Sequence, residues 1–263
     1  MKIEMSTDNT KYQLLKDYYS TGVEDKRLQA DKAHQVEFLT TTRYIDKYLK
    51  PNDKILEVGA GTGAYSIYYA EKGYEVNSLE LVPENINILK SKITKDMNIN
   101  VTEGTALDLS CYENNTFDMT LVLGPLYHLY TEEDKKKAIE EALRVTKPNG
   151  YLYIAYLTND SVMLSYGLKK RHLLDKGLFD ENYKFYDKPE EILTTFNIDE
   201  FNRLMDNYPI ENITTVATDG LSSILRDYVN ILDDEEFKVW LDYHYKSCEK
   251  KDLIGYSSHA LYI

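Results

Sequence analysis

The chain has 263 residues, of which 43% are hydrophobic and 29% charged, and its formal net charge is −13. This composition is ordinary for a globular protein with one sizeable core. The negative charge argues against a nucleic acid partner, because phosphate binding needs a basic surface. No run of about 18 apolar residues occurs, and the first residues lack the apolar core of a secretory signal. We therefore expect no membrane association and a cytoplasmic location.

The first half of the chain predicts helices that alternate with strands. Residues 1–50 read mostly as helix, which Pro51 ends, and we expect them to form an N-terminal helical cap. An apolar run at 55–58 predicts the first strand, a helix begins near Gly63, and a second apolar run covers 74–80. The same alternation continues with a helix from Pro83, strands at 99–103 and 117–123, a helix from Thr131 to Val145 and a strand at 151–157. This order predicts an α/β fold with a doubly wound, mostly parallel sheet.

The alternation stops after the fifth strand. We expect residues 51–157 to be the α/β core and the charged, tyrosine-rich residues 158–208 to be an inserted helical cap. Residues 209–263 would then complete the core sheet, with a sixth strand within 211–218 and a last strand at 258–263.

The most informative motif is the glycine-rich turn after the first strand. The stretch 55–63 reads Ile-Leu-Glu-Val-Gly-Ala-Gly-Thr-Gly, and Glu80 ends the next strand about 20 residues later. Glycine lets a ligand approach bare backbone, and a carboxylate at that distance accepts hydrogen bonds from ribose hydroxyls. One interpretation is a dinucleotide site that uses Gly59, Gly61 and Ala64, as in an NAD(P)-dependent oxidoreductase. The other depends on the residues downstream.

The order of the motifs from about Tyr44 to Leu157 resembles class I S-adenosylmethionine (SAM) methyltransferases, in particular the small-molecule "type 11" group. Glu57 with the three glycines resembles their first motif, Asp108 follows the third strand, and 143–152 resembles their step into the fifth strand. The resemblance implies a seven-stranded sheet whose last strand is reversed, SAM as the cofactor, and a small-molecule acceptor.

The resemblance also assigns roles to residues. Gly59, Ala60 and Gly61 would pass beneath the methionine and ribose of SAM, and Glu80 would bind both ribose hydroxyls. The remaining predicted cofactor contacts are Leu81 along the adenine, Asp108 at its amino group, Leu109 beside the base, Leu123 after the fourth strand, Tyr19 in the N-terminal cap, and Arg27 at the SAM carboxylate.

His128 is the predicted general base for methyl transfer. It follows the fourth strand, at the edge where ligands bind in open α/β sheets, and its ordinary pKa of about 6.5 suits proton transfer near neutral pH. A structural role in shaping the pocket is the equal alternative, because in-line methyl transfer depends mainly on alignment. The histidines show no metal-binding spacing, so we expect no metal. A non-catalytic SAM-binding regulator also remains open.

Overall fold

The protein is built around a single sheet of seven strands, seen in a computed structural model that describes residues 7–22, 24–175, 177–185 and 192–263. The strands lie in the order β3-β2-β1-β4-β5-β7-β6. Their bounds are β1 Lys54–Val58, β2 Glu75–Glu80, β3 Ile99–Glu103, β4 Phe117–Val122, β5 Thr146–Leu157, β6 Thr215–Ala217 and β7 His259–Tyr262. β7 runs antiparallel to both of its neighbours, while β1 to β5 pair in parallel. The predicted fold class and the reversed last strand are confirmed.

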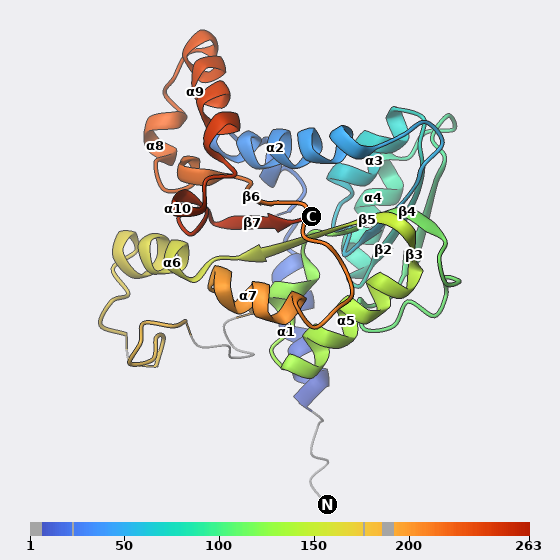
Figure 1. Ribbon diagram of the computed structural model, residues 1–263, viewed down its shortest axis with the longest axis horizontal. Helices are drawn as coiled ribbons and strands as arrows, with labels where there is room; N and C mark the ends of the chain where they lie inside the picture. Colours follow the sequence, from blue (N-terminus) through green and yellow to red (C-terminus); the bar gives the residue numbers. More distant parts are fainter. Residues whose placement is uncertain (1–6, 23, 176, 186–191) are drawn as a thin grey trace, which may run out of the picture.

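Helices cover both faces of this sheet, with α2 and α3 on one side and α5 and α7 on the other (Figure 1). The longer helices are α1 Thr7–Tyr19, α2 Lys32–Tyr48, α3 Ala64–Glu71, α4 Pro83–Lys92, α5 Glu132–Val145, α7 Ile198–Met205 and α9 Asp234–Ser247. The shorter ones are η1 Arg27–Gln29, η2 Pro125–His128, α6 Asn159–Val162, the π-helix η3 Met163–Lys169, η5 Gly220–Ser222, α8 Arg226–Val229 and α10 Lys251–Ile254. No helix among the described residues is long and apolar enough to cross a membrane.

Local chemistry explains where these helices begin and end. Pro83 occupies the first turn of α4, where its missing N–H costs nothing. The hydroxyl of Thr131 accepts a hydrogen bond from the Asp134 amide and caps α5. Gly73 follows α3 with φ +89°, a left-handed conformation that glycine adopts without strain. These signals are local, which is why the sequence predicts them well.

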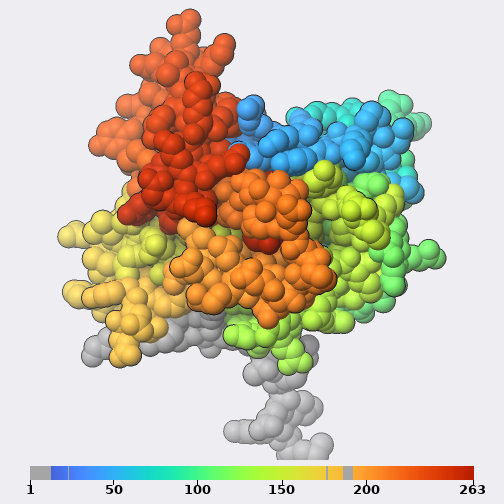
Figure 2. Space-filling model, viewed as in Figure 1, coloured from blue at the N-terminus to red at the C-terminus, as the bar shows by residue number. Residues whose placement is uncertain are grey.

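The region after β5 differs from the expected cap. The expected cap of residues 158–208 includes α7, but α7 packs in the core: the Phe201 ring stacks on Tyr156 of β5 at 4.0 Å between centroids and touches Tyr262 of β7 at 5.6 Å. Phe201 and Met205 are buried and lie four residues apart, so one apolar helix face covers the sheet. Figure 2 shows this orange segment filling the front of the molecule. Residues 186–191 of the expected cap lie outside the described residues.

Candidate active site

A cavity of about 790 Å³ opens at the carboxyl edge of the parallel strands. Most of the predicted site residues line it: Tyr19, Arg27, Gly59, Ala60, Gly61, Glu80, Leu81, Leu123 and His128. One wall, which we call the cofactor half, comes from the ends of β1, β2 and β3 and includes Gly61, Glu80 and Thr105–Leu107. The other, the acceptor half, comes from the ends of β4 and β5 and the start of β7, with Glu37 and Asp219 beside them.

The three glycines of the turn have different structural reasons. A Cβ on Gly59 would lie 2.7 Å from Pro125 Cγ, and one on Gly63 would lie 2.1 Å from Leu89 Cδ1, so both positions need glycine for packing. Gly61 has φ +55°, and a Cβ there would meet nothing within 4 Å. Because Gly61 lines the cavity, that open space is where a ligand can approach the backbone.

Glu80 is held rigidly across this turn. Its Oε2 accepts a hydrogen bond from the Gly61 amide at 2.7 Å, and its Oε1 accepts from the Val82 amide at 2.9 Å and from Asn85 Nδ2 at 3.3 Å. Burial raises the pKa of Glu80, and the hydrogen bonds from Val82, Gly61 and Asn85 oppose that rise. Carboxylate oxygens keep lone pairs beyond these bonds, so Glu80 can still accept from ligand hydroxyls.

Two predicted cofactor contacts lie elsewhere. Asp108 is exposed and its Oδ1 accepts from the Ser110 amide at 2.9 Å, so it stabilises its own turn. Leu109 is fully buried in the core, and its amide donates to Glu141. The cavity wall after β3 is formed instead by Thr105, Ala106 and Leu107. The expectation for Asp108 and Leu109 is therefore corrected, because the turn directs both side chains away from the cavity.

Arg27 contacts carboxylates of the protein itself. Its Nε donates to Glu24 at 2.8 Å, and its two terminal nitrogens donate to the two oxygens of Glu37 at 2.7 and 3.0 Å. Such a bidentate pair is strong and geometrically specific. The pairing of Arg27 with the SAM carboxylate stays a prediction, since the structure shows only that Arg27 holds Glu37.

His128 lines the cavity with both ring nitrogens engaged. Its Nδ1 lies 2.7 Å from the Ile192 carbonyl oxygen, so Nδ1 must carry the proton and donate it. Nε2 then accepts from the Tyr19 hydroxyl at 2.8 Å. Burial lowers the pKa of His128 to about 4, and the bond to Ile192 only partly opposes this. The lone pair that a general base needs is thus occupied by Tyr19.

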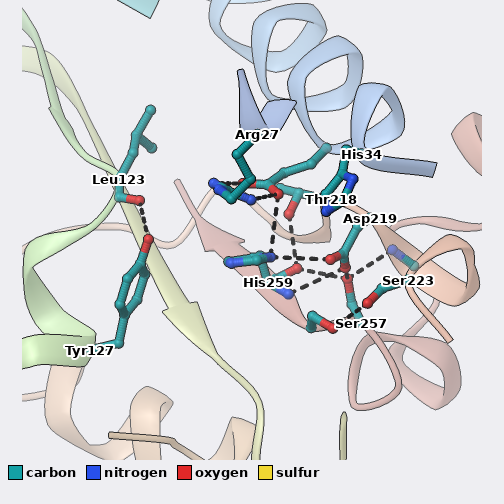
Figure 3. Close-up of polar contacts among 12 residues, drawn as sticks. Arg27, His34, Leu123, Tyr127, Thr218, Asp219, Ser223, Ser257 and His259 are labelled. Carbon is teal, nitrogen blue, oxygen red and sulfur yellow. Dashed lines mark hydrogen bonds and ion pairs between the residues drawn. The ribbon is translucent and has the colours of Figure 1, made fainter. Parts of the chain in front are cut away.

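A second histidine lies in the acceptor half, at the start of β7. His259 Nδ1 is 3.1 Å from Asp219 Oδ2 and 3.5 Å from Glu37 Oε2. Figure 3 shows the His259 ring between Tyr127 on one side and Asp219 on the other, with Arg27 close by. Burial disfavours a charge on His259, but Glu37 and Asp219 outweigh it and raise its pKa above the ordinary value.

The sequence gave little sign of this cluster. Glu37 lies on a helix, Asp219 follows β6, and His259 begins β7, so the three are far apart along the chain. The available signal was positional: a reversed strand starts at the carboxyl edge of its parallel neighbours, so its first residue faces the ligand side. The pairing of His259 with Leu157, the last residue of β5, is that geometry.

The same three residues also fit a crude metal test. One ligand atom each from Glu37, Asp219 and His259 lies within 4.8 Å of the others. However, both oxygens of Glu37 are held by the Arg27 guanidinium. A fixed positive charge on that carboxylate disfavours a cation there, so we assign no metal to the cluster.

Comparisons with known proteins identify the class. Residues 56–154 match the family model described as "Methyltransferase domain". The glycine/sarcosine N-methyltransferase of Aphanothece halophytica is 26% identical over 180 residues, which cover 62% of this chain and 68% of that protein. A demethylmenaquinone methyltransferase of Paenarthrobacter aurescens (strain TC1) is 32% identical over 126 residues, 48% of this chain and about half (47%) of that protein.

Solved structures agree on the fold. The PH0226 protein of Pyrococcus horikoshii OT3 superposes with a TM-score of 0.59 at 19% identity, covering 76% of this chain and 92% of that one. A SAM-dependent methyltransferase of Leishmania major gives 0.58 at 18% identity, covering 78% and 75%.

The sheet order, the glycine turn and the matching domain define a class I methyltransferase fold. The chain is a SAM-dependent methyltransferase, and its cofactor is SAM. The dinucleotide interpretation of the glycine turn is not supported by these matches.

Proposed function

We propose that the protein transfers the methyl group of SAM to a small-molecule acceptor by direct in-line displacement. The observation that carries the proposal is one cavity of about 790 Å³ in which the glycine turn and Glu80 face the acceptor half. That volume lies within the range of small-molecule sites, roughly 300–1,000 Å³. The net charge of −13 disfavours nucleic acid as the acceptor.

The cofactor half fits SAM. Open space beside Gly61 leaves room for the ligand next to the backbone, and Glu80 can accept from the ribose hydroxyls. Leu81 and Leu107 offer apolar surface for the adenine. The bound cofactor supplies an electrophilic methyl group on a sulfonium. What the protein supplies is alignment: it holds the acceptor atom opposite that methyl group and excludes water.

The relatives indicate which acceptors to try first. One is named for glycine and sarcosine and another for demethylmenaquinone, and all of these are small molecules. For this chain they support a small acceptor as a class and do not select one.

The test has two arms. Calorimetry with S-adenosylhomocysteine should show binding to the wild-type protein. Incubation with SAM and separate pools of small amines, phenols and quinols should then yield a methylated product by mass spectrometry, whereas DNA, RNA and denatured protein should not. Methylation of a macromolecule alone would overturn the proposal. Tight cofactor binding with no transfer to any pool would favour a regulator.

A further inference from the structure

We propose that His259, oriented by Asp219 and Glu37, is the group that takes the proton from the acceptor, which must therefore carry an exchangeable proton on its reacting atom, as a hydroxyl or an ammonium does. This inference rests on the proposed function and adds to it the catalytic residue and the chemical class of the acceptor. Three observations support it, in the order in which the site is built.

The first observation is how firmly the orienting carboxylate is held. Asp219 Oδ1 accepts from the Ser257 hydroxyl at 2.5 Å and from the His259 amide at 3.2 Å, which leaves Oδ2 for the imidazole. Ser257 in turn accepts from the Gly220 amide at 2.8 Å. Asp219 is 4% exposed, so its position does not depend on solvent.

The second observation is the direction in which the proton can move. Because Nδ1 faces Asp219 Oδ2 and Glu37 Oε2, Nδ1 is the nitrogen that donates. The neutral ring then carries its lone pair on Nε2. Figure 3 shows this second ring nitrogen pointing away from Asp219 toward the side of Tyr127. Within the part of the chain that the structure describes, no hydrogen bond to Nε2 is recorded, and His259 lines the cavity.

The third observation is the electrostatic surroundings. The groups facing His259 are Glu37 on α2, Arg27 on η1, Asp219 after β6 and the Tyr127 ring on η2, 6.1 Å between centroids. The Arg27 and His259 charges outweigh burial and lower the pKa of Glu37 to about 2, so Glu37 stays ionised. Two carboxylates therefore stabilise the imidazolium that forms when His259 accepts a proton.

The reaction balances without any further reactant. The O–H or N–H bond of the acceptor breaks and its proton goes to His259 Nε2. The lone pair of the acceptor atom forms the new bond to the methyl carbon, and the carbon–sulfur bond breaks with its electrons remaining on sulfur. An acceptor with no such proton would gain nothing from His259. His128 cannot take this role while Tyr19 occupies its Nε2.

The closing experiment measures the free lone pair directly, in the protein without cofactor. Diethyl pyrocarbonate acylates unprotonated imidazole nitrogens, and trypsin places His259 in 252–263 and His128 in 96–135, with no other histidine in either peptide. We expect His259 to be acylated at least tenfold faster than His128, at a rate that rises with pH through a midpoint above 6.5. Equal or slower reaction of His259 would overturn the proposal.

Variants test the orienting carboxylates. Asp219→Asn should move the His259 midpoint to lower pH, because one stabilising anion is lost, and Glu37→Gln serves the same purpose if Asp219→Asn does not fold. The matched control is Asp175→Asn, which removes the carboxylate from a surface pair with His172 (2.7 Å) and should leave the midpoint unchanged. A midpoint that does not move in either cavity variant would overturn the role of the carboxylates.

Turnover links the titration to catalysis. With an acceptor identified in the pools above, His259→Gln should lower kcat about 10²-fold while the affinity for S-adenosylhomocysteine stays within about twofold. Wild-type kcat in this variant would remove His259 from the mechanism. Loss of S-adenosylhomocysteine binding by the wild-type protein would instead contradict the proposed function, and the acylation result would still stand by itself.

Discussion

The two halves of the cavity differ in how they are built. The cofactor half comes from one continuous stretch, in which β1, the glycine turn and β2 bring Gly61 and Glu80 together about 20 residues apart. The acceptor half is assembled from η1, α2, η2, the loop after β6 and β7, which are separated by most of the chain. The first is a local motif with one solution, whereas the second depends on which distant segments the fold brings to the sheet edge. Specificity for the acceptor therefore resides in the part of the site that sequence describes least.

The strongest test of the cofactor half is Gly61→Val. The branched side chain would fill the open space beside the turn and strain a backbone at φ +55°, so binding of S-adenosylhomocysteine should be abolished. Gly73→Val is the matched control: Gly73 also has φ +89° with nothing within 4 Å of its Cβ, but it lies outside the cavity. Calorimetry should show loss of binding in the first variant alone. Normal binding by Gly61→Val would remove the turn from the cofactor site.

A smaller effect is expected at Glu80. Glu80→Ala should weaken S-adenosylhomocysteine binding by about 1.5–3 kcal/mol, because charge-assisted hydrogen bonds to the ribose are lost. Glu80→Gln keeps the shape and one acceptor oxygen, and it should lose less. If calorimetry finds unchanged affinity in a folded Glu80→Ala variant, the carboxylate serves only the turn that it binds through Gly61 and Val82.

The pH dependence of stability probes the floor of the cofactor half, where Glu57 is 3% exposed. Burial raises the pKa of Glu57 to about 8, with hydrogen bonds from Ser66 opposing the rise. A folded-state pKa above the unfolded value stabilises the protein fully below about pH 4, and that contribution is lost as the pH rises through 8. Unfolding in urea should therefore give roughly 1–2 kcal/mol less stability at pH 8 than at pH 6 from this group. In Glu57→Gln that part of the decline should disappear, and an identical decline in both proteins would contradict it.

The acceptor half is sharpened by comparing its two histidines. Tyr19→Phe removes the hydroxyl that donates to His128 Nε2, and we expect less than about a tenfold loss of kcat, since His128 positions the wall. His128→Gln should behave similarly and should raise the acceptor KM more than it lowers kcat. Steady-state kinetics on the acceptor found in the pools distinguishes the cases. A loss of about 10²-fold in kcat with a changed pH profile would restore His128 as the base.

The smallest effect is expected at Asp108. Its side chain is exposed and caps its own turn, so Asp108→Ala should change S-adenosylhomocysteine affinity by less than about 0.5 kcal/mol. Thermal unfolding in the absence of ligand is the control, because loss of the cap affects stability alone. A loss of affinity comparable to that of Glu80→Ala would return Asp108 to the adenine pocket.

The fold and the cofactor half were predictable because their signals are local. A strand that ends in Gly-x-Gly-x-Gly, a proline at the first turn of α4 and a threonine cap on α5 each act within a few residues. The three glycines illustrate the limit. Sequence marks Gly59, Gly61 and Gly63 alike, and only packing shows that two of them face Pro125 and Leu89 and one faces the cavity.

The sequence by itself determined the sheet, the cofactor and the carboxylate at the end of β2, because side-chain period and turn chemistry are properties of neighbouring residues. Tertiary structure decided which histidine has a free nitrogen. His128 and His259 look alike in the sequence, yet a carbonyl from residue 192 and the hydroxyl of Tyr19 occupy the first, while Asp219 and Glu37 orient the second. Hydrogen-bond partners that come from distant segments set the protonation of a side chain, and no spacing along the chain encodes them.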